Sequence, residues 1–129
     1  MEIPLRAGLI GWLKSDAALA GLLNAITEEA PSRTALPWLA IATSASVDWS
    51  TKTEPGYETR IAVELQLRGD RPEDGAALTG AVQARIAAIP RDQGGFRIVT
   101  LQFLRSRAEA RANNTRAMLL EYRFRTIAA

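Results

Sequence analysis

The amino-acid sequence predicts an α+β fold in which a mainly antiparallel four-stranded sheet carries helices on one face, with elements in the order ααββαββ. Leucines recur at helical spacing near the N-terminus, and apolar and polar residues alternate with a period of two in three later segments. A further helical stripe separates two pairs of strands. The chain has 129 residues, the size of one domain of about 100–150 residues, so we expect a single domain over residues 1–129.

Two helices are predicted at the N-terminus. The first covers residues 4–14, with Pro4 in its first turn. Its apolar stripe consists of Leu5, Leu9, Trp12 and Leu13. Ser15 or Asp16 can cap a second helix, because a short oxygen-bearing side chain accepts hydrogen bonds from free N–H groups at a helix start. The stripe of this helix consists of Leu19, Leu22, Leu23 and Ile26.

The first pair of predicted strands flanks a long polar segment. The apolar run at residues 38–42 predicts a buried strand, and the alternation over residues 60–68 predicts a strand with one wet face. Residues 44–58 are polar and include the turn signal Pro55-Gly56. We therefore predict a loop there, of a length that is uncommon in compact domains and tends to be functional or disordered.

A third helix and two more strands complete the predicted fold. The helix runs from Pro72 to Ile89, and strands are predicted over residues 96–104 and 116–125. Residues 105–116, rich in arginine and containing Asn113-Asn114, predict a second long loop. The predicted core comprises Ile61, Val63, Leu65, Leu101, Phe103, Leu120, Tyr122 and Phe124, packed against Leu78, Val82 and Ile86.

The composition argues against an enzyme. The chain has no cysteine and no histidine, so it lacks thiol chemistry, the commonest metal ligand and the usual general base near neutral pH. Asp70, Glu73 and Asp74 form the densest acidic cluster, but carboxylates beside Pro72 are expected at the positive end of a helix. We therefore expect no cofactor and no bound metal, and an enzyme that uses only carboxylates and arginine is the weakest alternative.

Charge is unevenly distributed along the chain. The net charge is +2, but residues 1–90 carry −3 and residues 91–129 carry +5, with arginine as the only basic residue type in the second part. Arginine favours planar pairing with carboxylate or phosphate, so one alternative function is a small nucleic-acid-binding module that uses these arginines. No segment has the roughly 20 apolar residues of a membrane span, and we expect a soluble protein made in the cytoplasm.

Several segments together resemble a known family. They are residues 14–23 (KSDAALAGLL), the Leu-Pro-Trp-Leu-Ala-Ile run at 36–41, Gly56-Tyr57-Glu58 before the second strand, the helix from 72 to 89 and the closing strand at 116–125. In order and spacing they resemble the small phage tail-completion or tail-terminator proteins, which join heads to tails and also occur in prophages and gene transfer agents. The resemblance spans nearly the whole chain.

The resemblance implies a structural role. Such subunits form a ring, typically a hexamer, that caps the tail tube and connects it to the head connector or stopper protein. They have no catalytic residues, make no membrane contact, and meet DNA only as it passes non-specifically through the ring. The implied location is the host cytoplasm during assembly and then the tail of the virion or gene transfer agent.

The two predicted loops supply the candidates for contact with the tail or with other subunits. In the second loop and at its end these are Arg105, Arg107, Arg111 and Arg116, and in the first loop they are Asp48, Trp49, Lys52 and Tyr57. Long polar segments without an apolar stripe cannot offset their ordering entropy alone. We therefore expect both loops to be mobile in the isolated subunit and ordered in the assembled tail.

Overall fold

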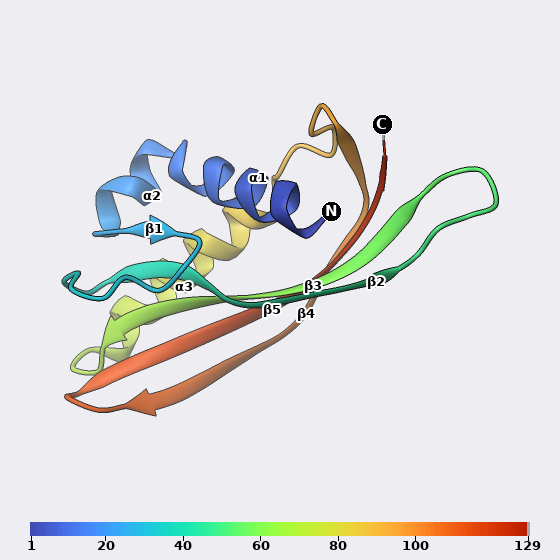
Figure 1. Ribbon diagram of the computed structural model, residues 1–129. Helices are drawn as coiled ribbons and strands as arrows, with labels where there is room; N and C mark the ends of the chain where they lie inside the picture. The colour runs from blue at the N-terminus through green and yellow to red at the C-terminus, as the bar shows by residue number, and fades with distance from the viewer. Residues whose placement is uncertain (129) are drawn as a thin grey trace.

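A computed structural model describes residues 1–128 and, for residue 74, the backbone alone. The fold is α+β (Figure 1). Its elements are α1 (Glu2–Lys14), α2 (Ala17–Leu22), β1 (Ile26–Thr27), β2 (Trp38–Asp48), β3 (Gly56–Arg68), α3 (Pro72–Ala87), β4 (Phe96–Arg111) and β5 (Thr115–Ala128). The strands form one mixed sheet in the order β1-β2-β3-β5-β4, in which β1 is parallel to β2 and the other pairs are antiparallel. The predicted four-stranded sheet is therefore corrected to five strands.

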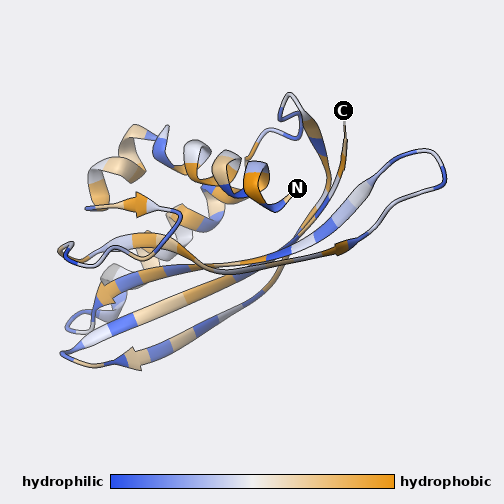
Figure 2. Cartoon of the chain, viewed as in Figure 1, coloured by the Kyte–Doolittle hydropathy of each residue, from blue (hydrophilic) through white to orange (hydrophobic). Residues whose placement is uncertain are grey.

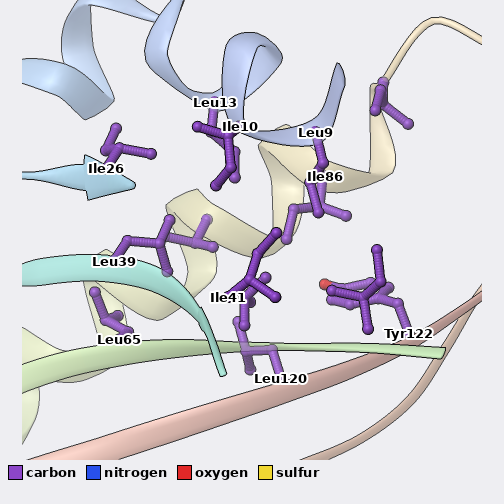
Figure 3. Close-up of a cluster of buried hydrophobic side chains, with 14 of the residues drawn as sticks. Leu9, Ile10, Leu13, Ile26, Leu39, Ile41, Leu65, Ile86, Leu120 and Tyr122 are labelled. Atoms are coloured by element: carbon purple, nitrogen blue, oxygen red, sulfur yellow. The ribbon is translucent and has the colours of Figure 1, made fainter. Parts of the chain in front are cut away.

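The three helices lie on one face of the sheet, as predicted (Figure 1). Apolar side chains of α1 and α3 point down onto the central strands and meet residues of β2, β3 and β5 (Figure 3). Burial of this cluster supplies the main favourable contribution to folding, because apolar surface is removed from water. The opposite face carries no helix in the described part of the chain.

Helix α2 is shorter than predicted, and its end creates the extra strand. Asp16 caps it as expected, accepting a hydrogen bond from the Ala18 N–H at 3.1 Å. The backbone becomes extended at Leu23. Ile26 therefore lies outside the helix, in β1, where it pairs with Leu39 of β2. Ile26 is still buried, because the strand turns its side chain toward the same core.

The predicted loop at residues 44–58 is wrong. Most of it belongs to a long hairpin: β2 continues to Asp48, β3 begins at Gly56, and only residues 49–55 connect them. The backbone ladder specifies this hairpin, and Ser46 and Thr59 add a side-chain hydrogen bond of 2.8 Å across it. Small polar residues on both faces gave no alternation by which the strands could be recognised.

The predicted loop at residues 105–116 is wrong for the same reason. Strand β4 runs to Arg111 and β5 begins at Thr115, so only a tight turn separates them. Asn113 and Asn114 take positive φ values of 59° and 55°, a conformation that asparagine tolerates and that matches the twist of hairpin strands. The sequence correctly placed a turn at these asparagines but not the strands on either side.

Most of the predicted core is buried. Phe103 is the exception, at 45% exposure, and Leu101 is half-buried. Both lie in β4, an edge strand with irregular register between Ile98 and Thr100 and again between Phe103 and Arg105. Phe103 packs edge-on against Tyr122, with ring centroids 5.3 Å apart, and its other side faces solvent at the sheet border.

Candidate assembly surface

The hairpin of β2 and β3 forms an arm, residues 42–60, that projects beyond the helical layer (Figure 1). Its root is attached to α1 through Arg6, which donates hydrogen bonds to Ser44 Oγ at 2.7 Å and to a Glu28 carboxylate oxygen at 3.2 Å. Ser44 in turn donates to the Glu2 carboxylate at 2.9 Å. The guanidinium group of Arg6 is planar and donates to Glu28 and Ser44 at the same time. These contacts therefore fix the direction in which the arm leaves the body.

The four candidate residues of the first predicted loop come together at the tip of this arm. Asp48 accepts hydrogen bonds from the Ser50 N–H and hydroxyl at 3.2 and 2.6 Å, which orders the connection. Lys52 is exposed there, and Tyr57 is exposed at the start of β3. The ring of Trp49 lies under the Arg125 guanidinium, 5.3 Å from its centroid. The tip is therefore an ordered polar surface with aromatic groups.

The four candidate arginines are divided between the two faces of the sheet. Strand register puts Arg105, Arg107 and Arg111 on the face without helices, whereas Arg116 lies opposite Leu67 on the helix side and is half-buried. The structure therefore brings three of the predicted arginines together and separates the fourth from them.

Carboxylates pair with these arginines across the bare face. Arg105 donates to Glu121, and this hydrogen bond, together with the charge of Glu121, raises the pKa of Arg105 above its ordinary value. Arg111 lies 2.7 Å from a Glu109 carboxylate oxygen and 3.5 Å from one of Glu64. Arg107 approaches Glu109 at 3.6 Å. Figure 2 shows the resulting alternation of hydrophilic and hydrophobic residues along β4.

The ladder of charges continues toward the arm. Glu58 accepts a hydrogen bond from Arg125 at 2.9 Å and lies 3.9 Å from Arg123, which also donates to Gln102. The arginines on the bare face are Arg60, Arg68, Arg97, Arg105, Arg107, Arg111, Arg123 and Arg125, and its glutamates are Glu58, Glu64, Glu109 and Glu121. Within the described residues, Arg60, Arg68 and Arg97 have no carboxylate at ion-pair distance. The face is therefore positive overall, although most of its arginines are paired.

Sequence reasoning missed the glutamates of this ladder. Glu64 and Glu121 alternate with buried apolar residues in predicted strands, so their position on the wet face could have been recognised. Their pairing with Arg111 and Arg105 could not, because it depends on strand order. The sheet places β5 between β3 and β4, and this order brings residues distant in sequence to one surface.

The described side chains of the acidic cluster at the start of α3, Asp70 and Glu73, make separate contacts. Asp70 accepts a hydrogen bond from the Asn114 amide, and Glu73 lies 3.5 Å from Arg71; the side chain of Asp74 lies outside the described part of the structure. Pro72 opens the helix, but its N-cap is Arg71, which makes no side-chain cap. Among the described residues, no group of three potential ligands is placed to hold a metal, and no helix there is long and apolar enough to cross a membrane.

The arm tip and the β4–β5 turn lie at opposite ends of a long sheet, and the candidate arginines extend from that turn to Arg105, near the middle of the sheet. The arm tip is next to Gly56, the first residue of β3, and the β4–β5 turn is next to Arg68, its last. A strand of this length extends about 40 Å at roughly 3.3 Å per residue. The chain therefore presents two separated surfaces connected by the charged face.

Comparison with known proteins gives the family. The chain is similar in structure to a chain of the virion of a native gene transfer agent particle, with a TM-score of 0.70, 22% sequence identity, and coverage of 97% of this chain and 95% of that chain. At this identity the similarity establishes the fold. No curated protein sequence matches the chain closely enough to count. The model of the family described as tail completion protein gp17 matches residues 7–127, and the chain therefore belongs to this phage tail-completion family.

Proposed function

We propose that this protein is the structural subunit that closes the end of a phage-like tail, where it assembles as a hexameric ring and joins the tail tube to the head connector or stopper protein. Family membership supports a structural role in the tail. The observation that carries the proposal is the shape: an ordered arm projects from one end of a sheet whose second face, in the described part of the chain, has no helical cover. Such surfaces on one chain are suited to contacts with several neighbours.

The same proposal places the protein in the tail of a virion or gene transfer agent after assembly in the host cytoplasm. The fold that it shares with a chain of a gene transfer agent virion supports this location. We propose no enzymatic activity and no membrane contact. DNA would meet the ring only in passage, through non-specific contact with phosphates.

A nucleic-acid-binding module is the second candidate, and one observation favours it: arginines outnumber glutamates on the bare face. However, Arg105, Arg111 and Arg125 already have carboxylate partners within the subunit. An arginine that is already paired with a carboxylate neutralises a phosphate less well, so its binding to DNA releases fewer counterions and adds less affinity. Pairing within the subunit therefore argues against DNA binding as the main function of this surface.

Tail particles that lack this protein provide the test. Purified wild-type protein should co-sediment with such tails, appear by electron microscopy as a closed ring at one tube end, and restore joining to filled heads. Binding along the whole tube, or binding to DNA in preference to tails, would contradict the proposal. A matched control is the Lys14→Ala variant, which changes an exposed charge on α1 away from the arm and the bare face and should bind normally.

A further inference from the structure

The helix side of the sheet contains a hollow of about 560 Å³ at the end remote from the arm. It opens between the end of α2, the last residues of β3 and the first turns of α3. Its lining is mostly apolar and includes Leu22, Pro37, Leu67, Gly75 and Leu78. Leu22 is 58% exposed, although burial of a leucine side chain is favourable. The hollow therefore presents apolar surface that the described part of the chain leaves uncovered.

A cation stands beside this apolar surface. The charged residues of the lining are Arg68, Asp70 and Arg71, and Arg68, the last residue of β3, is exposed. Among the described residues, no carboxylate lies within ion-pair distance of its guanidinium. An occupant with an apolar side chain and a neighbouring carboxylate would complement both features.

The tip of the arm has these two properties. Val47 is 61% exposed and Tyr57 is 39% exposed, and both lie next to the connection at 49–55. Glu54 in that connection is exposed, and its carboxylate makes no ion pair within the described chain. Contacts of Arg6 with Ser44 hold the arm outward from the body, so a tip that carries Val47 and Tyr57 among polar residues is presented to a partner.

A subunit cannot place its own tip in its own hollow. The tip adjoins Gly56 and the hollow adjoins Arg68, at opposite ends of β3, and a strand of that length extends about 40 Å. A projecting element and a complementary hollow at opposite ends of one molecule allow head-to-tail contact, which generates a ring when the rotation closes. These observations commit the occupant to a second copy of the same chain.

We propose that the tip of the arm, with Tyr57 as its apolar anchor, inserts into the hollow between α2 and α3 of the neighbouring subunit, with Glu54 facing Arg68. This contact rests on the proposed function, since it is the joint between subunits of the ring. In this contact the arm of one subunit binds the hollow of the next. The interface is therefore heterologous, because the two subunits contribute different surfaces.

Cross-linking in the naturally cysteine-free chain tests the contact. Thr53→Cys at the tip and Ala77→Cys in the hollow are combined in one chain, bound to tail tubes and treated with a short thiol-specific cross-linker. We expect a ladder of covalent oligomers that ends at the size of the ring, whereas each single variant should stay monomeric. The matched control combines Thr53→Cys with Ala108→Cys, an exposed alanine of the edge strand β4, and should give no ladder.

The outcomes separate this inference from the function on which it rests. If completed tails form but the first pair fails to cross-link, or the control pair cross-links instead, the arm-to-hollow contact is wrong and the ring proposal stands. If wild-type protein is absent from tube ends, both proposals fail. A charge exchange adds a second readout: Glu54→Arg or Arg68→Glu alone should reduce ring formation at least tenfold, and the double variant should recover most of it. Equal ring formation in all three variants would overturn the pairing of these charges.

Discussion

At the scale of single residues, Leu65 shows how little free space the centre of the sheet contains. It is fully buried in β3 between the helices and the neighbouring strands. We predict that Leu65→Ala lowers the free energy of unfolding by about 2–5 kcal/mol, because the substitution removes apolar contacts and leaves a cavity. Urea denaturation followed by circular dichroism measures the loss. Val47→Ala, at an exposed position, is the control and should cost less than about 0.5 kcal/mol.

Gly56 lies where the backbones of Trp49 and Thr126 both approach the first residue of β3, which leaves no room for a side chain. A Cβ atom there would lie 2.8 Å from the Trp49 carbonyl oxygen and 2.9 Å from that of Thr126, and neither carbonyl can move without disturbing the strand ladder. We predict that Gly56→Ala destabilises the protein by about 1–3 kcal/mol, measured by chemical denaturation.

Gly80 provides a control of opposite sign for that substitution. It lies within α3, where a Cβ atom would meet no heavy atom within 4 Å. Alanine is more favourable than glycine inside a helix by about 1 kcal/mol. Gly80→Ala should therefore stabilise the protein, and equal losses from both substitutions would argue against the steric explanation at Gly56.

Tyr122 makes stability depend on pH at high pH. Burial raises the pKa of its phenol from 10.0 to about 12, because the charged phenolate is poorly solvated in the core. The neutral phenol of Tyr122 contributes fully to stability below pH 10, because 10.0 is the pKa of tyrosine in the unfolded chain. This contribution is lost as the pH rises to about 12, the pKa in the folded protein. We predict a fall of about 2–3 kcal/mol across this window. Tyr122→Phe should lose less stability across the same window, and parallel curves for both proteins would refute the assignment.

At the scale of elements, a reciprocal contact joins α1 to α3. Trp12 Nε1 donates to the Arg85 carbonyl at 2.7 Å, and Arg85 donates to the Trp12 carbonyl at 2.9 Å while its guanidinium lies 3.3 Å from the centroid of the indole ring. Lysine cannot reproduce a planar group that stacks and donates two hydrogen bonds to one carbonyl.

We therefore predict that Arg85→Lys lowers stability by about 1–3 kcal/mol, despite the conserved charge. Thermal unfolding of the variant provides the measurement. The same replacement at Arg97, which is exposed on β4, should change the melting temperature little. If both variants melt together, the α1–α3 contact contributes less than its geometry indicates.

The β4–β5 hairpin is expected to contribute to assembly more than to subunit stability. Arg107 and Arg111 are about half exposed and pair with Glu109, and exposed ion pairs are worth about 0–1 kcal/mol each. We predict that changing both arginines to alanine blocks ring formation or tail joining and leaves the melting temperature nearly unchanged. Unfolding of the double variant would assign these arginines to the sheet itself, and normal assembly into infectious or transfer-competent particles would exclude them from the interface.

At the scale of the whole molecule, the sequence predicted the fold class because the core residues follow strong periodicities. The alternation of Ile61, Val63 and Leu65 identified β3, and the stripe of Leu78, Val82 and Ile86 identified α3. The distal parts of the β2–β3 and β4–β5 hairpins were not predicted. Strands that are exposed on both faces lack the alternation of apolar and polar residues by which a strand is recognised. The expectation that these segments are loops, mobile until assembly, does not survive the strand pairing seen there.

The candidate surface was only partly predictable for a related reason. Residue type singled out the arginines, since all basic residues after position 90 are arginine. Their partners Glu64 and Glu121 and their distribution between two faces depend on register. The arm tip gathers Asp48, Trp49 and Tyr57 only because its strands pair up to the connection.

At the scale of the whole molecule, the salt dependence of DNA binding by the charged face would distinguish a tail protein from a nucleic-acid module. For double-stranded DNA, the logarithm of the binding constant falls with the logarithm of salt concentration by about 0.9 for each phosphate contact. Use of all the bare-face arginines named above would give a slope of about −7, whereas Arg60, Arg68 and Arg97 alone would give about −3. We predict the shallower slope, because carboxylates of the same subunit already occupy the other arginines. Fluorescence anisotropy of a short labelled duplex, titrated with the isolated subunit at several salt concentrations, measures it. The Arg60→Ala, Arg68→Ala, Arg97→Ala triple variant should lose nearly all of the remaining affinity, and a slope near −7 for the wild-type chain would instead favour direct DNA binding as the function of this face.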